Sequence, residues 1–132
     1  MKTAYVASRF AAKERVKEIY SELEKMGYSI PGNWTNHQPI KPYEKYPELS
    51  EEYAVTDLDF ARNSDLFILI SEGAGTGMHT ELGAAMDHFL EFKKPIIYVI
   101  GEHLDSSMFF FHPAIKRKQT IEQVIEELKL ID

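Results

Sequence analysis

The chain has 132 residues, of which 44% are hydrophobic and 27% charged, a composition typical of one soluble domain spanning residues 1–132. Its net charge of −6 argues against a nucleic acid polymer as partner, because such binding requires a basic face. The chain lacks cysteine, which excludes disulfides and thiolate chemistry, and no apolar run is long enough for a membrane span. Residues 1–3 lead directly into a predicted strand rather than a signal peptide, so we expect a cytoplasmic protein without membrane partners.

The N-terminal part of the chain predicts a strand–helix–strand unit. Residues 4–7 form a short apolar run, and residues 11–26 place apolar side chains on one face of a helix. Gly27 fits the position just beyond the end of this helix. Residues 28–30 are a second strand, which ends at Pro31. Such a unit implies two parallel strands joined by a right-handed crossover.

Residues 33–49 show neither a helical nor a strand pattern. Three prolines interrupt this stretch, and Trp34, Tyr43 and Tyr46 supply aromatic side chains. A loop of this length in a compact domain is usually functional or disordered. Two interpretations remain open: an ordered lid over a binding site, which the aromatic content favours, and a surface loop that packs on the core.

The middle of the chain predicts a helix, a buried strand and a second helix. Ser50 can cap a helix over residues 51–61, which has acidic residues in its first turn. Residues 66–70 form a continuous apolar run, as is typical of a strand buried on both faces. The glycine-rich turn 73–77 follows, and Glu81 then stands at the start of a helix with apolar residues at helical spacing.

The C-terminal part predicts two further strands and a closing helix. Residues 95–100 form another buried apolar run, and residues 107–112 are a candidate fifth strand. Residues 120–123 match a capping box, after which apolar residues follow at helical spacing from Ile121.

Alternating strands and helices predict a three-layer α/β domain of flavodoxin-like, or Rossmann-like, type with a parallel sheet of five strands. The strand order 2-1-3-4-5 places a switch point between the first and third strands, where open α/β sheets bind ligands. We therefore expect Tyr5 and residues 8–10 to lie beside residues 73–81, around one pocket.

The glycine turn and the histidines give little chemical information. The turn lacks the Lys-Ser/Thr ending of a Walker loop, and Gly75 and Gly77 do not complete a dinucleotide fingerprint. A backbone contact to an anion or ribose and a tight turn without ligand both remain open. None of the five histidines has the spacing of metal ligands, so we predict no metal site.

Two carboxylates are better candidates for chemistry. Glu81 is expected at the glycine turn, with Asp57 near it in the predicted fold. Glycosyl transfer uses two carboxylates in different environments, one as nucleophile and the other for the proton of the leaving group. Acidic residues at helix starts also stabilise helices, so the residues alone leave both interpretations open.

Three ordered motifs resemble those of one enzyme family. They are YVASRF at 5–10, TDL at 56–58 before SDL at 64–66, and GTG at 75–77 followed by ELGAA at 81–85. The last motif is the most specific, because it joins a glycine turn to a Glu-Leu-Gly helix start. With these motifs the chain resembles, over most of its length, the nucleoside 2-deoxyribosyltransferase superfamily. This superfamily includes relatives that hydrolyse the N-glycosidic bond of nucleoside monophosphates.

The resemblance implies roles for three catalytic residues. Glu81 would be the nucleophile, which forms a covalent glycosyl ester and gives retention after the second displacement. Asp57 would handle the proton of the departing base, and Tyr5 would hydrogen-bond the nucleophile. Members of this family work as homodimers or higher homo-oligomers, without metal or organic cofactor, so we expect neither cofactor here.

A substrate site for a nucleoside or its monophosphate is also implied. Its expected residues are Ser8, Arg9, Phe10, Trp34, Gly75, Gly77, Met78 and Ser106. Four of them would hold a 5′-phosphate: Ser8, Arg9, Gly75 and Gly77. Trp34, or a nearby aromatic side chain, would stack on the base. Ser106 belongs to a segment that a neighbouring subunit would contribute to the pocket.

The sequence also departs from the family pattern. Three residues separate Gly77 from Glu81, and no aspartate stands beside Gly73 as a further pocket acid. The leading hypothesis is an enzyme that cleaves or exchanges the N-glycosidic bond of a (deoxy)nucleoside. The alternatives are a (deoxy)nucleoside 5′-monophosphate N-glycosidase, for which water is the acceptor, and a non-catalytic nucleotide-binding module.

Overall fold

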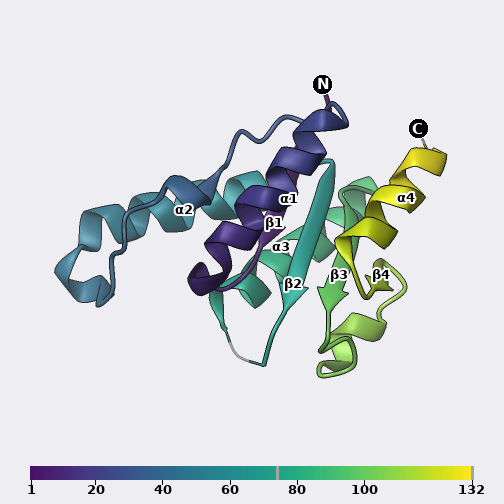
Figure 1. Ribbon diagram of the computed structural model, residues 1–132. Helices are drawn as coiled ribbons and strands as arrows, with labels where there is room; N and C mark the ends of the chain where they lie inside the picture. Colours follow the sequence, from purple (N-terminus) through teal and green to yellow (C-terminus); the bar gives the residue numbers. More distant parts are fainter. Residues whose placement is uncertain (74, 132) are drawn as a thin grey trace.

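The computed structural model describes residues 1–73 and 75–131 and has three layers (Figure 1). The middle layer is a parallel sheet with the strand order β1-β2-β3-β4. Its strands are β1 (Ala4–Ala7), β2 (Leu66–Ser71), β3 (Ile96–Gly101) and β4 (Ile115–Lys118). The helices are α1 (Lys13–Lys25), α2 (Pro47–Asn63), α3 (Gly77–Phe92) and α4 (Ile121–Ile131). Helices α1 and α4 cover one face of the sheet, while α3, with α2 packed beside it, covers the other. The predicted three-layer α/β architecture is confirmed.

The three strands that were predicted from apolar runs form the core of the sheet. All six residues of β2 are buried, because this strand lies between β1 and β3 and has helices on both faces. Tyr5 of β1 stands opposite Phe67 of β2, and their rings stack with centroids 6.0 Å apart. This packing fixes the position of the Tyr5 ring beside β2.

The predicted count of five strands is wrong: among the described residues the sheet has four. Residues 28–30 contribute only an isolated parallel bridge to Thr3. Side chains cover the outer edge of β1 instead. The hydroxyl of Tyr20 accepts a hydrogen bond from Val6 N at 3.0 Å, and Trp34 Nε1 donates to Val6 O at 2.6 Å. Since these side chains satisfy the backbone groups that a further strand would pair with, the sheet ends here.

The prediction of a strand at residues 107–112 is also wrong. This segment contains the short 3₁₀-helix η4 (Met108–Phe111), whose start is capped by Ser107 Oγ accepting from Phe109 N at 3.2 Å. The strand follows as β4, where Lys116 and Arg117 are exposed. Because β4 is an edge strand with charged residues, it lacks the apolar run by which the inner strands were recognised.

The end of α1 and the start of α4 agree with the sequence signals, whereas α2 and α3 start earlier than expected. Gly27 has φ +99° just beyond α1, and Thr120 and Gln123 form the predicted capping box with two hydrogen bonds of 3.3 Å. Helix α2, however, starts at Pro47 rather than after Ser50. Proline is favoured at the first position of a helix, since its missing N–H would have no partner there.

Residues 33–49, the last three of which already belong to α2, form an ordered connection with two short 3₁₀-helices, η2 (Trp34–Asn36) and η3 (Tyr43–Lys45). The first is capped by Asn33, which accepts from Thr35 N at 3.1 Å. Trp34 is buried, whereas Tyr43 and Tyr46 remain exposed. The connection is therefore anchored to the core at one end and open to solvent at the other.

No helix in the described part of the chain is long and apolar enough to cross a membrane.

Candidate active site

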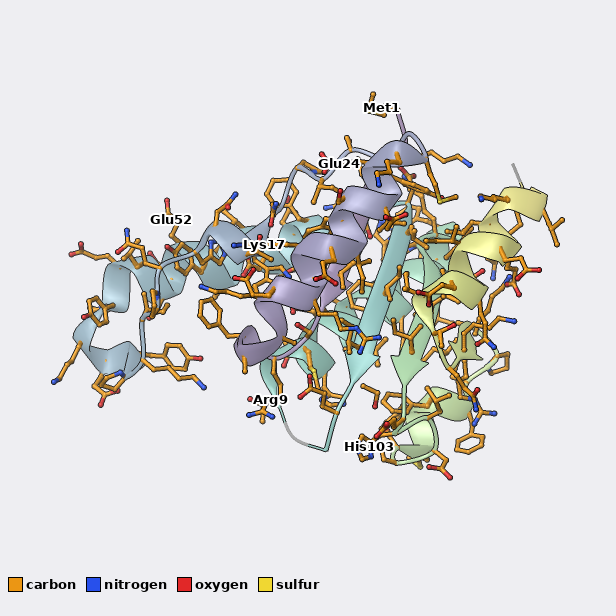
Figure 2. All side chains as sticks on the ribbon, viewed as in Figure 1. Met1, Arg9, Lys17, Glu24, Glu52 and His103 are labelled. Carbon is orange, nitrogen blue, oxygen red and sulfur yellow. The ribbon has the colours of Figure 1, made fainter. Side chains whose placement is uncertain are left out.

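A cavity of about 460 Å³ lies where β1, the connection 33–49, α2 and the start of α3 meet. It is at the carboxyl end of the sheet, the end where Figure 2 labels Arg9 and His103. All the site residues predicted from the sequence line this cavity except Ser106. The residues brought together are Tyr5, Ser8, Arg9, Phe10, Trp34, Asp57, Gly75, Gly77, Met78 and Glu81.

Tyr5 and Glu81 are joined directly. Tyr5 lies on β1, while Glu81 lies in the second turn of α3, since this helix already starts at Gly77. The hydroxyl of Tyr5 donates a hydrogen bond to Glu81 Oε2. Burial, with the negative charge of Glu81, raises the pKa of Tyr5 well above its ordinary value. Tyr5 therefore keeps its proton and remains a donor to the carboxylate at any ordinary pH.

Glu81 is held in an environment that opposes its ionisation. Burial raises its pKa from 4.5 to about 8. The hydrogen bond from Tyr5 lowers the pKa and the charge of Asp57 raises it, and both effects are smaller than that of burial. A carboxylate poor in water contacts is a strong nucleophile once ionised, and it stabilises a positive charge forming beside it.

Asp57 is bound by a histidine from the connection 33–49. His37 Nε2 lies 2.8 Å from Asp57 Oδ1, and each side chain is 23% exposed. The imidazole ring stacks on Tyr53, one helical turn before Asp57, with centroids 3.6 Å apart and planes 7° from parallel. Burial raises the pKa of Asp57, while the hydrogen bond and charge of His37 oppose that rise. The two acids of the cavity thus have different partners.

Trp34 forms an apolar wall of the cavity. Its ring is 6.2 Å from that of Phe10, between centroids, and its Nε1 already donates to Val6 O at 2.6 Å. The indole can therefore offer a bound molecule the surface of its ring but no hydrogen bond from its N–H group.

The glycine turn needs glycine at one position for two reasons. Gly75 has φ +112°, a conformation that residues with a Cβ rarely adopt. A Cβ atom here would also lie 3.0 Å from Met78 Cε and 3.1 Å from Arg9 Cγ. The carbonyl of Gly75 is 2.9 Å from His79 Nδ1, which ties the turn to α3. Residue 74, also in the predicted turn, lies outside the described residues.

Arg9 stands at the rim of the cavity with an acidic partner. Its guanidinium Nη1 is 3.2 Å from Glu72 Oε2, and the side chains are 47% and 30% exposed. The hydroxyl of Ser8 donates to the carbonyl of Arg9 at 2.9 Å. The charge of Arg9 is thus already partly balanced by a carboxylate.

Ser106 lies away from this cavity, where its hydroxyl donates to His103 O at 3.3 Å. That Ser106 completes the pocket of a neighbouring subunit stays a prediction.

Several lining residues were not identified from the sequence. They are Ala11, His37, Gln38, Pro39, Ile40, Lys41, Tyr43 and Tyr53. His37 was considered only as a metal ligand, although Tyr53 and Asp57 stand four residues apart and so share one helix face. Within residues 1–73 and 75–131, no group of three His, Asp or Glu side chains is arranged to hold a metal.

A second depression, also about 460 Å³, lies between β4 and α4. Its best candidate for chemistry, Glu127, is already bound by Lys118 at 2.8 Å, Lys116 at 3.1 Å and the hydroxyl of Tyr98 at 2.7 Å. These contacts lower the pKa of Glu127 to about 2, so it is a carboxylate fully engaged in holding α4 to the sheet. The first cavity is therefore the better candidate site.

Comparison of the chain with models of protein families, with curated proteins and with solved structures found no match. A functional assignment must therefore be argued from the side chains of the cavity.

Proposed function

We propose that this protein is an enzyme of the nucleoside 2-deoxyribosyltransferase type, which cleaves or exchanges the N-glycosidic bond of a (deoxy)nucleoside. The observation that carries the proposal is the grouping of Glu81, its donor Tyr5 and a second acid, Asp57, around one cavity. The two acids differ in burial and in partners, as acid and nucleophile in glycosyl transfer require. A volume of about 460 Å³ is within the range of small-molecule sites.

In the first half-reaction, the bond between the anomeric carbon and the base nitrogen breaks, and its electron pair goes to the base. Asp57 gives its carboxyl proton to the base, while a carboxylate oxygen of Glu81 forms an ester bond with the anomeric carbon. Burial of Glu81 favours its protonated form in the empty site, so Glu81 gives this proton to solvent before the bond to the base breaks. The positive charge that develops on the sugar favours the ionised form, which is the reacting one.

In the second half-reaction, an acceptor attacks the anomeric carbon and the ester bond breaks, its electron pair returning to Glu81. The acceptor gives its proton to the carboxylate of Asp57, which restores the starting state. With a second base as acceptor the reaction is transfer, and with water it is hydrolysis. Trp34 and residues 37–41 of the connection line the cavity, and Trp34 lies against Phe10 from the segment after β1; we expect this wall to limit the access of water.

The test is a panel of nucleosides and 5′-monophosphates, each incubated with the protein and assayed for free base. We expect release from at least one member, complete loss with Glu81→Gln, and normal release with Glu18→Gln, an exposed acid on α1. Mass spectrometry of the quenched reaction should show one sugar bound to the chain, and none with Glu81→Gln. Full activity of Glu81→Gln would falsify the proposal.

Arg9 and Lys41 at the cavity favour a second candidate, a 5′-monophosphate N-glycosidase, because both could contact a phosphate. Adding a second free base to the assay separates the two reactions. An exchanged nucleoside identifies a transferase, whereas free sugar or sugar phosphate without exchange identifies a hydrolase. Thermal stabilisation by members of the panel without any base release would instead identify a non-catalytic binding module.

A further inference from the structure

His37 belongs to the connection 33–49, here called the covering segment, and contacts Asp57, the second acid of the cavity. Its Nε2 is 2.8 Å from Asp57 Oδ1, and its ring lies flat on that of Tyr53. The next residue, Gln38, donates its backbone N–H to the hydroxyl of Tyr53 at 3.2 Å. Residues 37–38 are thus attached to one face of α2 by a hydrogen bond at each end and by the ring stack between them. Both rotation of the imidazole and movement of this segment away from α2 would break these contacts.

The contact distinguishes the two oxygens of Asp57. With the proton of the imidazole on Nε2, Oδ1 is the acceptor of this 2.8 Å contact. Because Oδ1 then accepts the hydrogen bond from His37, the proton of the carboxyl group is carried by Oδ2. The charged and titratable groups that face this pair are Tyr53 on the same helix and Glu81 and Tyr5 across the cavity, with Lys41 and Arg9 further along its wall.

We propose that His37 is the positioning residue that makes Asp57 an effective acid for the departing base. This inference rests on the proposed function. The N–H of His37 keeps Oδ2 as the oxygen that holds the transferable proton. When this proton has moved to the base, the same hydrogen bond stabilises the carboxylate left behind. His37 itself neither contacts the sugar nor loses a proton in this step. The covering segment therefore supplies the partner that Asp57 needs, and Asp57 is fully competent only while that segment is in place.

Two variants of His37 separate the hydrogen bond from the ring stack. His37→Phe keeps an aromatic ring on Tyr53 and removes the donor, whereas His37→Gln keeps an N–H donor and removes the ring. The control is His103→Gln, an exposed histidine outside the cavity. Thermal unfolding of each variant establishes that it folds.

Two substrates separate positioning of the acid from general damage to the site. One is the best nucleoside of the panel; the other is an analogue whose base leaves with less need of a proton, 7-methylated for a purine or 5-fluorinated for a pyrimidine. With His37→Phe, kcat on the ordinary nucleoside should fall about 10- to 100-fold, the worth of a hydrogen bond to a charged group, while KM changes little. On the analogue kcat should fall at most about 3-fold, and His37→Gln should stay within about 5-fold of the unsubstituted protein on both.

Equal losses on the two substrates, or no loss with His37→Phe, would overturn the inference and leave the proposed function standing. Equal losses with His37→Phe and His37→Gln on the ordinary nucleoside alone would overturn it as well, because a donor would then not suffice. If the unsubstituted protein releases base from neither substrate, the proposed function itself is wrong. The analogue also serves as an internal measure of folding, since an unfolded variant loses both activities.

Discussion

The hydroxyl of Tyr5, at the second position of β1, donates a hydrogen bond to the carboxylate of Glu81 in the second turn of α3. The two residues are 76 positions apart in the chain. Tyr5 is almost completely buried and stacks on Phe67, so its hydroxyl has little freedom to move. This rigid donor both orients Glu81 and is the main effect that opposes the rise of its pKa by burial.

Replacing Tyr5 by Phe should lower activity and shift its pH dependence. Without the hydroxyl, the pKa of Glu81 should rise beyond about 8, because the hydrogen bond that lowers it is gone. We expect kcat to fall about 100-fold, the worth of a hydrogen bond to a charged group. The rise of kcat/KM that should accompany the ionisation of Glu81 near pH 8 should move to higher pH. The measurement is base release between pH 6 and 10. Tyr46→Phe, an exposed tyrosine outside the cavity, is the matched control, and an unshifted profile of Tyr5→Phe would contradict the expectation.

Replacing Glu81 by Gln should stabilise the fold, and more so at alkaline pH. The pKa of Glu81 is about 8 in the folded chain and 4.5 as its ordinary value. Below pH 4.5 Glu81 holds its proton in both the folded and the unfolded chain, so its ionisation does not change the free energy of unfolding. As the pH rises toward 8, the unfolded chain releases the proton and the folded chain retains it, so stability falls.

The gain from Glu81→Gln should therefore grow from near zero at pH 4.5 to up to roughly 5 kcal/mol at pH 9, since the pKa differs by 3.5 between 4.5 and about 8 and each pKa unit is worth about 1.4 kcal/mol. Urea unfolding at pH 5, 7 and 9 measures it. Glu18→Gln on α1 is exposed and serves as control. A gain that is the same at all three pH values would show that Glu81 ionises as readily in the folded chain as in the unfolded one.

Trp34→Phe tests the covering of the edge of β1. The substitution keeps a ring at the cavity but removes the N–H that donates to Val6 O at 2.6 Å. We expect the free energy of unfolding to fall by about 1–3 kcal/mol, since a buried carbonyl loses its strongest donor. Urea unfolding at neutral pH measures this loss, with Tyr43→Phe, an exposed ring in the same connection, for comparison. A loss below about 0.5 kcal/mol would mean that the hydroxyl of Tyr20 satisfies this carbonyl unaided.

Glu72→Gln should alter the preference between a nucleoside and its 5′-monophosphate. Glu72 balances the charge of Arg9 at 3.2 Å, so a phosphate bound by Arg9 would also face this carboxylate. Removing the negative charge should raise the ratio of kcat/KM for the monophosphate to that for the nucleoside about 3- to 10-fold, and less at high salt. Parallel kinetics with both substrates at 20 and 300 mM NaCl give this ratio. An unchanged ratio would show that Arg9 does not contact the phosphate.

Much of the fold could be predicted from the sequence because its inner strands are continuous apolar runs. Where the sheet ends on either side could not be predicted from the sequence. At one edge the capping groups come from Tyr20 and Trp34, which are distant in the chain from Val6, so no local pattern at residues 28–30 reveals that pairing stops. At the other edge, the run of aromatic residues before Pro113 imitates a strand, while the true strand β4 is largely charged.

The residues of the candidate site were foreseen to the extent that they belong to the motifs around β1, α2 and α3. His37 was missed because it lies in a connection without periodicity, where nothing local indicates which helix it meets. The spacing of Tyr53 and Asp57 shows that one helix face carries a ring and an acid, but the partner of that face comes from 16 to 20 residues earlier in the chain. Contacts of this kind are tertiary and leave no mark in a single sequence.

The two borders of the sheet have a consequence for behaviour in concentrated solution. An open strand presents unpaired amides and carbonyls, on which another chain can grow a β-structure. Near Val6 those groups are occupied by the phenol and the indole. Along β4, Lys116 and Lys118 are bound by Glu127, and Arg117 between them leaves an exposed positive charge at the edge, which repels the same charge of a second copy. Each border thus has its own protection against fibrous self-assembly, one steric and one electrostatic, and only the second should weaken when salt is added.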